Sequence, residues 1–123
     1  MSNLRFGQVQ FQIMQVIWEF GRVNARDITD SLNKFKPIAH STVQTLLRKL
    51  EQKGAVAHDI EERTFIFYPL VKKEKVTQFG VRDIMDRMFA GSPSALVSNL
   101  IKNEKFTRQE LDDIKKLISE KEK

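Results

Sequence analysis

The residues with the clearest chemical pattern lie between His40 and Gly54. At helical spacing, one face of this segment carries hydroxyls, amides and long cations instead of the Glu and Lys pairs of an ordinary solvated helix. Hydroxyls and amides can hydrogen-bond to base edges, and Arg and Lys pair with phosphates. The face therefore suits nucleic acid, although taken alone it fits a plain amphipathic surface helix equally well. Its members are Ser41, Gln44, Thr45, Arg48 and Gln52, with Thr42 and Lys49 on its flank.

The opposite face of the same segment is apolar. Val43, Leu46, Leu47 and Leu50 recur at the i, i+3, i+4, i+7 spacing that forms one stripe of a helix. Such a stripe must face a core, and Gly54 is a typical stop signal. We therefore predict a helix that packs on a core through one face and presents the polar face outward.

Two further helices are predicted before this segment. The range 8–20 has an apolar stripe that includes Val9, Ile13, Val16, Ile17 and Phe20, and it ends at Gly21. Asn24 has the character of an N-cap for a short helix over 25–32. Pro37 then breaks the helical pattern, so the three helices form a helix-turn-helix arrangement.

Two β-prone runs follow, at 56–60 and 64–68, separated by the turn-sized polar gap 61–63. This pattern predicts a hairpin that ends at Pro69. Three helices followed by a hairpin is the order of a winged helix, whose third helix enters the major groove. We assign residues 1–71 to a winged-helix DNA-binding domain. In it, Ser41, Thr42, Gln44 and Thr45 approach base edges and nearby phosphates, while Arg48, Lys49 and Arg63 mainly contact phosphates.

The range 72–123 is predicted to be helical throughout. Gly91 ends one long helix, Ser92-Pro93 opens the next, and Thr107 with Glu110 forms a capping box for the last. A segment of this size cannot enclose a good core alone, so we predict a three-helix dimerisation domain completed by a second copy of the chain. Its predicted interface residues are Leu96, Val97, Leu100, Ile101, Leu111, Ile114, Leu117 and Ile118. The predicted fold class is thus mainly α with a small β-hairpin.

Composition restricts the function classes. The 123 residues are 41% hydrophobic and 30% charged, which is typical of a folded domain. The formal net charge of +5 favours an anionic partner such as double-stranded DNA. No apolar run is long enough for a membrane span and no signal peptide is apparent, so we expect a cytoplasmic protein. The absence of Cys excludes disulfides, thiolate metal sites and cysteine nucleophiles.

Nothing in the sequence predicts catalysis. His40 and His58 lie far apart without acidic residues at metal-ligand spacing, so ordinary capping, surface or strand roles are expected for both. The sequence also lacks a Gly-rich phosphate loop, a nucleophile elbow and an H-E-x-x-H pattern. We predict neither a metal nor a cofactor, and we do not expect an enzyme.

Several stretches resemble the penicillinase-repressor family of bacterial winged-helix regulators (BlaI and MecI). The resemblance runs over nearly the whole chain, and it implies a homodimeric transcriptional repressor that binds palindromic operators. In the antibiotic-responsive members, release comes by proteolysis within the C-terminal domain, which implies a sensor-linked protease as a further partner. The stretches that carry the resemblance are 16–18, 41–50 with 53–54, 65–68, 89–92 and 96–100.

The chain departs from the family pattern at three places, one of which is Gln10 in the first helix, where members often place an acid. The family's cleaved bond is similar to Asn-Phe, and the matching pair here is Asn99-Leu100. The wing is acidic for a phosphate-binding element, with Asp59, Glu61 and Glu62 around a single Arg63. Two other functions remain open on the sequence: a winged-helix protein-protein adaptor, and a regulator whose helical half binds a small-molecule effector.

Overall fold

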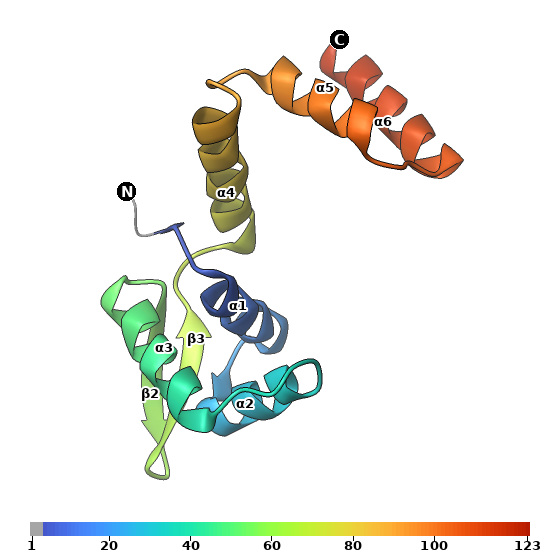
Figure 1. The fold of residues 1–123 in the computed structure, drawn as a ribbon. Helices are drawn as coiled ribbons and strands as arrows, with labels where there is room; N and C mark the ends of the chain where they lie inside the picture. Colours follow the sequence, from blue (N-terminus) through green and yellow to red (C-terminus); the bar gives the residue numbers. More distant parts are fainter. Residues whose placement is uncertain (1–3) are drawn as a thin grey trace. The chain divides into compact units, whose positions relative to one another are not determined.

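The structure, a computed structural model, describes residues 4–123 and consists of helices with one small sheet (Figure 1). Three helices and a hairpin come first, and helices alone follow the hairpin. The elements of this range are α1 (Gln8–Phe20), β1 (Val23–Asn24), α2 (Ala25–Asn33), α3 (His40–Gln52), β2 (Val56–Glu61), β3 (Thr64–Pro69), α4 (Lys73–Met88), α5 (Pro93–Asn103) and α6 (Arg108–Lys121). The predicted fold class, mainly helical with a small antiparallel sheet, is confirmed.

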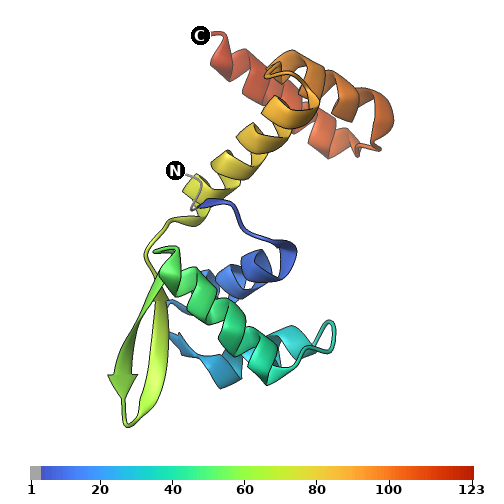
Figure 2. The ribbon, with the colours of Figure 1, turned by 60° about the vertical axis from the view of Figure 1, so that its left-hand side comes forward.

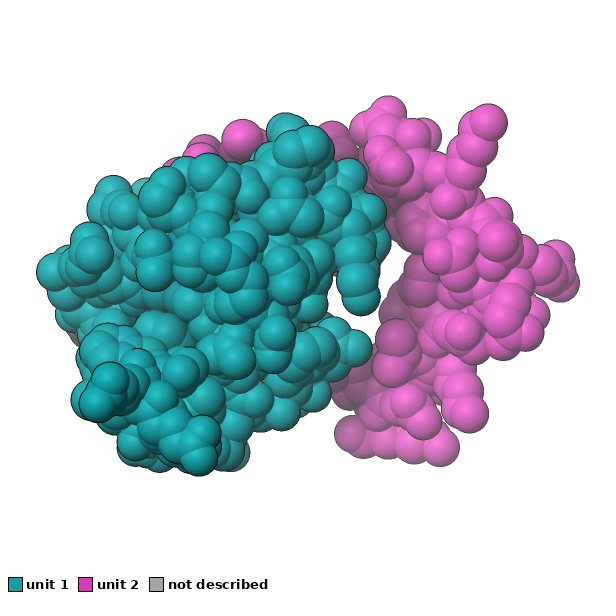
Figure 3. Space-filling view, turned by 90° about the horizontal axis from the view of Figure 1, so that it is seen from below, with its two compact units in different colours: residues 1–82 teal, residues 83–123 magenta. Residues whose placement is uncertain are grey.

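The chain divides into two compact units, which Figure 3 shows in different colours. The first ends at Arg82 and the second runs from Asp83 to Lys123. The division falls inside α4, so this helix belongs to both units. The functional boundary after Val71 that the sequence suggests stays a prediction.

The ends of the first two helices follow from capping. Gly21 has φ 79° and its N–H donates to the carbonyl of Ile17 at 2.7 Å, which ends α1 where the sequence predicts. The Asn24 side chain accepts from the backbone N–H of Asp27 at 2.8 Å and so caps α2. The predicted helix starts and stops in this part of the chain are therefore confirmed.

The sheet has the strand order β1-β3-β2, with both pairings antiparallel. In the hairpin, Val56 is opposite Pro69 and Glu61 is opposite Thr64. Figure 2 shows this hairpin beside α3, with its tip projecting past the three N-terminal helices. Strand β1 is not predicted, because a run of two residues carries no periodic signal. It pairs with β3 and so attaches the hairpin to the chain between α1 and α2.

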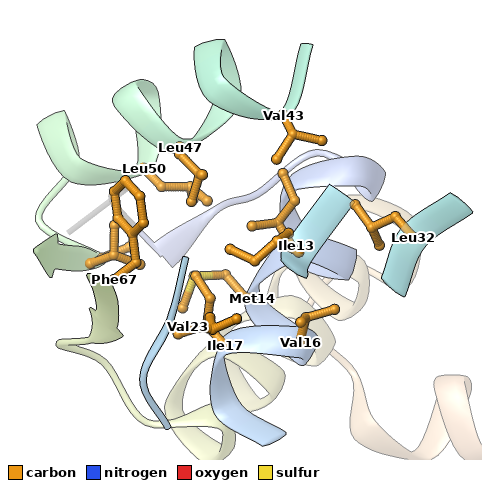
Figure 4. Packing of buried hydrophobic residues seen from close by; sticks show 13 residues of the cluster. Ile13, Met14, Val16, Ile17, Val23, Leu32, Val43, Leu47, Leu50 and Phe67 are labelled. Atoms are coloured by element: carbon orange, nitrogen blue, oxygen red, sulfur yellow. The ribbon is translucent and has the colours of Figure 1, made fainter. Parts of the chain in front are cut away.

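The core of the first unit lies between the three helices and the sheet (Figure 4). Met14 is completely buried, whereas Phe20, which the sequence places on the core stripe of α1, is half exposed. Phe20 is the last residue of α1, and Met14 contributes to the core from the middle of the helix. The cluster of buried residues is Ile13, Met14, Val16, Ile17, Val23, Ile28, Leu32, Val43, Leu47, Leu50, Ala55, Val56 and Phe67.

The second unit has well-formed helix ends but little interior. Ser92 accepts from the N–H of Ala95 at 3.1 Å, and Thr107 and Glu110 form the reciprocal capping box that the sequence predicts. Neither α5 nor α6 has a buried residue. Within residues 4–123, no helix is both long enough and apolar enough to cross a membrane.

Candidate nucleic-acid interface

Helix α3 presents the two faces that its sequence predicts. Val43, Leu47 and Leu50 are buried in the core, and Leu46 packs at its edge. The six predicted contact residues of the helix are all exposed on its other side. The core therefore fixes the rotation of α3 about its own axis and leaves its hydrogen-bonding groups and cations accessible to a partner.

An open groove of about 850 Å³ runs between α3 and the hairpin. Gln44 and Arg48, one helical turn apart, line its helix side, and Arg63 lies on its hairpin side. The structure thus brings together three of the seven predicted contact residues around one groove. Ser41, Thr42, Thr45 and Lys49 are not part of its lining and occupy other exposed positions on α3.

The same groove is lined by seven further polar residues that were not predicted as contacts: Asn24, Arg26, His40, Glu51, Gln52, His58 and Thr64. Arg26 comes from the first turn of α2, His40 and Gln52 from the two ends of α3, and His58 from β2. The sequence places Gln52 on the polar face of the helix, four residues after Arg48, but we did not predict it as a DNA contact. Arg26 and His58 reach the groove through tertiary packing, which helical periodicity cannot predict.

His58 joins the hairpin to α3. Its Nδ1 lies 2.7 Å from Glu51 Oε1, and its ring is stacked on Phe65 with 3.9 Å between the ring centroids. The contact with Glu51 holds β2 beside the last turns of α3, whereas the stacking on Phe65 joins the two strands of the hairpin. His40, the first residue of α3, has its Nδ1 2.8 Å from Thr29 Oγ1 and links α3 to α2. Both histidines thus have the structural roles that the sequence favours.

The tip of the hairpin is a two-residue turn made by Glu62 and Arg63. Their φ angles are 51° and 68°, so both residues lie in the left-handed region. Turns of this kind favour Asn and Gly, because a side chain in that region costs about 1–2 kcal/mol per residue. Arg63 therefore occupies a position where glycine would be less strained. This makes the side chain of Arg63 a candidate for function rather than for folding.

Within residues 4–123, no group of three or more His, Cys, Asp or Glu side chains is placed to hold a metal ion. The interface is instead a polar and cationic helix face beside a groove, with an exposed arginine at the tip of the hairpin. This arrangement can make hydrogen bonds and charge pairs with a polyanion.

The comparison with protein families gives one match that spans most of the chain. The model of the family described as penicillinase repressor matches residues 6–120. The chain belongs to the penicillinase repressor family. Members of this family are DNA-binding repressors of transcription, not enzymes, and the chain is a repressor of this kind.

Individual relatives are distant in sequence but similar in length. The penicillinase repressor of Bacillus licheniformis is 23% identical over 116 residues, which are 94% of this chain and 91% of that protein. The methicillin resistance regulatory protein MecI of Staphylococcus aureus (strain N315) is 20% identical over 120 residues, 98% of each chain. These alignments extend through both units of the repressor.

A solved structure supports the fold of the first unit. The solution structure of the DNA-binding domain of the repressor BlaI matches with a TM-score of 0.52 and 29% sequence identity. It covers 56% of this chain and 84% of the BlaI domain. The winged helix that the order of elements predicts is therefore confirmed.

Proposed function

We propose that the chain acts as a homodimer that binds a palindromic operator in double-stranded DNA and represses the adjoining genes. In this proposal residues 1–71 bind DNA, and residues 72–123 hold two copies together. The observation that carries it is the polar and cationic face of α3, exposed beside the groove of the hairpin in a chain of the penicillinase repressor family.

The proposed contacts follow from the chemistry of each side chain. Ser41, Thr42, Gln44 and Thr45 lie in the first turns of α3, the part of a recognition helix that usually lies deepest in the major groove. Gln44 can make a bidentate contact with an adenine edge, a discrimination worth about 1–3 kcal/mol. Arg48 and Lys49 from later in α3, and Arg63 from the hairpin tip, pair with phosphates and fix the register of the protein on the duplex.

The proposed dimer interface lies on α5 and α6. Leu117 is 64% exposed and Ile118 is 53% exposed, a large cost in water for two adjacent apolar side chains. Val97, Leu100 and Ile101 of α5 are exposed as well, while Leu96, Leu111 and Ile114 are half buried. A second copy of the same helices would cover these residues through a self-complementary interface. Joining two winged helices in this way sets the spacing of two operator half-sites.

We further propose that repression ends when a sensor-linked protease cuts the Asn99-Leu100 bond. This bond lies within α5, and cutting it would separate α6 and the end of α5 from the rest of the chain. The dimer would lose apolar burial, and each released winged helix would bind only one half-site. In the folded helix the carbonyl of this bond, Asn99 O, accepts from Asn103 Nδ2 at 3.0 Å, so a protease requires local opening of α5.

Selection of genomic fragments by the purified full-length chain tests DNA binding and identifies the targets together. Recovery of one palindromic motif is the expected result. Fragments with no common motif, bound as tightly as random DNA, would contradict a sequence-specific repressor.

The release step is tested by expressing Asn99→Ala in the native host under inducing conditions, with immunoblotting of the protein and measurement of the target transcript. We expect the variant to stay intact and the target to stay repressed. Normal derepression with the intact variant would show that release occurs by another route, such as binding of a small molecule.

A further inference from the structure

The hairpin carries more acidic than basic residues. Asp59, Glu61 and Glu62 surround Arg63, so the element that should approach DNA phosphates has carboxylates that repel them. Either these carboxylates lie away from the DNA, or another group compensates their charge. The structure indicates that both apply to Asp59 and Glu61.

Strand alternation separates the two kinds of side chain. Because successive residues of a strand point to opposite faces, His58 lies on one face of β2 while Asp59 and Glu61 lie on the other. His58 lines the groove beside α3 together with Phe65 and Phe67, whereas Asp59 and Glu61 do not line it. The two carboxylates are therefore on the face of the hairpin turned away from the recognition helix.

Arg22 compensates the charge of these two carboxylates. Its Nη2 lies 2.8 Å from Glu61 Oε2 and 3.0 Å from Asp59 Oδ2. Its guanidinium carbon also lies 5.6 Å from the centre of the Tyr68 ring, a cation-π geometry. The hydrogen bonds to Glu61, and then to Asp59, raise the pKa of Arg22 above its usual value. Arg22 thus stays positively charged beside both acids.

The position of Arg22 in the chain means that its ion pairs also connect two strands of the sheet that are not neighbours. Arg22 directly precedes β1, and β1 pairs with β3, with Val23 opposite Phe67. Asp59 and Glu61 belong to β2, on the far side of β3 in the strand order. The side chain of Arg22 therefore extends across β3 and ties the outer strand of the hairpin to the edge of the sheet beside α2.

We propose that Arg22 is a positioning residue for DNA binding, which neutralises Asp59 and Glu61 and holds the hairpin in the orientation that presents Arg63 to phosphate. This proposal rests on the proposed DNA binding by α3 and the hairpin. The bonds of Arg22 are exposed, and exposed ion pairs contribute little to folding. The effect of Arg22 should therefore be found in DNA affinity and in the dynamics of the hairpin, not in global stability.

The experiment measures the binding of the full-length chain to a random-sequence duplex by fluorescence anisotropy over a range of salt concentrations. Random DNA suffices, because phosphate electrostatics supply nearly all of non-specific affinity. Arg22→Gln should weaken binding by about three- to tenfold near 0.15 M salt, because two uncompensated carboxylates then lie within a Debye length of the phosphates. Arg22→Lys, which keeps the charge, should retain most of the affinity.

A rescue separates this role from a direct contact. Adding Asp59→Asn and Glu61→Gln to Arg22→Gln removes the carboxylates that Arg22 neutralises, so it should recover most of the lost affinity even though Arg22 no longer holds the hairpin. The same two changes should give a smaller gain where Arg22 is present, because its charge is then already in place. The matched control is Glu62→Gln, a neighbouring acid outside the Arg22 contacts, which should give the same gain with and without Arg22.

Amide hydrogen exchange of β2 supplies a readout that is independent of DNA. We expect faster exchange in Arg22→Gln, while the thermal unfolding midpoint stays unchanged.

Unchanged DNA affinity in Arg22→Gln would overturn the proposal. An equal loss in Arg22→Gln and in the triple variant would also overturn it, because Arg22 would then contact phosphate itself. A wild-type chain that does not bind DNA at low salt would refute the proposed function, and with it the role of Arg22.

Discussion

The two compact units of the repressor differ in how they bury apolar surface. In the first, three helices and a sheet enclose a continuous cluster in which Ile13, Ile17 and Leu50 are completely buried. In the second, the helices are equally well capped, yet α5 and α6 have no buried residue. Local helix signals and core formation are therefore independent properties. A unit can therefore have well-capped helices without a core of its own when its apolar stripes pack against another surface.

The comparison predicts that the first unit depends on its own core. Leu50→Ala should lower the free energy of unfolding by about 2–5 kcal/mol, because it leaves a cavity at a fully buried site. The loss, measured by urea denaturation of this unit's signal, should not depend on protein concentration. Leu117→Ala in the second unit is the control and should leave that transition unchanged. A similar loss from both changes would mean that the units are not independent.

For the second unit, the prediction is a dependence on assembly. Ile114→Glu places a charge in the proposed interface, so it should give folded monomers and weaken operator binding by about a hundredfold through the loss of effective concentration. Lys116→Glu, a charge change at an exposed site of the same helix, should leave the dimer intact. Size-exclusion chromatography with light scattering distinguishes the two. A dimeric Ile114→Glu variant would show that the interface lies elsewhere.

The contrast between local helix signals and core formation also explains which parts of the fold and the site could be predicted from the sequence. Helix ends follow from contacts within a few residues, such as Asn24 with Asp27, and these were predicted correctly. The winged-helix order and the exposed face of α3 followed from periodicity. Contacts between residues distant in the chain were not predicted: the β1 pairing, the approach of Arg26 to the groove, and the bonds from Arg22 to Asp59 and Glu61. Each depends on how elements pack, which local patterns do not specify.

Within the first unit, base reading and phosphate pairing should separate by mutation. Gln44→Ala should lose about 1–3 kcal/mol of discrimination at one base position in each half-site, because a bidentate contact to a base edge is removed. Lys49→Ala should weaken operator and random DNA alike and reduce the dependence of affinity on salt. Competition binding with single-base operator variants measures both effects. Equal losses on operator and random DNA for Gln44→Ala would contradict base reading by this side chain.

The smallest expected effect concerns the strained turn of the hairpin. Arg63→Gly should raise the free energy of unfolding by about 0.5–1 kcal/mol, because relief of the left-handed strain exceeds the added backbone entropy of the unfolded chain. The same change should weaken DNA binding, since it removes the cation at the tip. Denaturation and anisotropy titrations of one preparation measure the expected rise in the free energy of unfolding and the expected fall in DNA affinity. If DNA affinity rose together with stability, Arg63 would have no role in binding.

The proposed homodimer is tested most directly by the number of chains that occupy one operator. Sedimentation equilibrium of the full-length chain, alone and bound to its selected operator duplex, measures this number. We expect a protein mass of twice the 14.3 kDa of one chain at micromolar concentration, and two chains on each operator. A free protein of 14.3 kDa that binds the operator as a single chain would contradict the proposed homodimer.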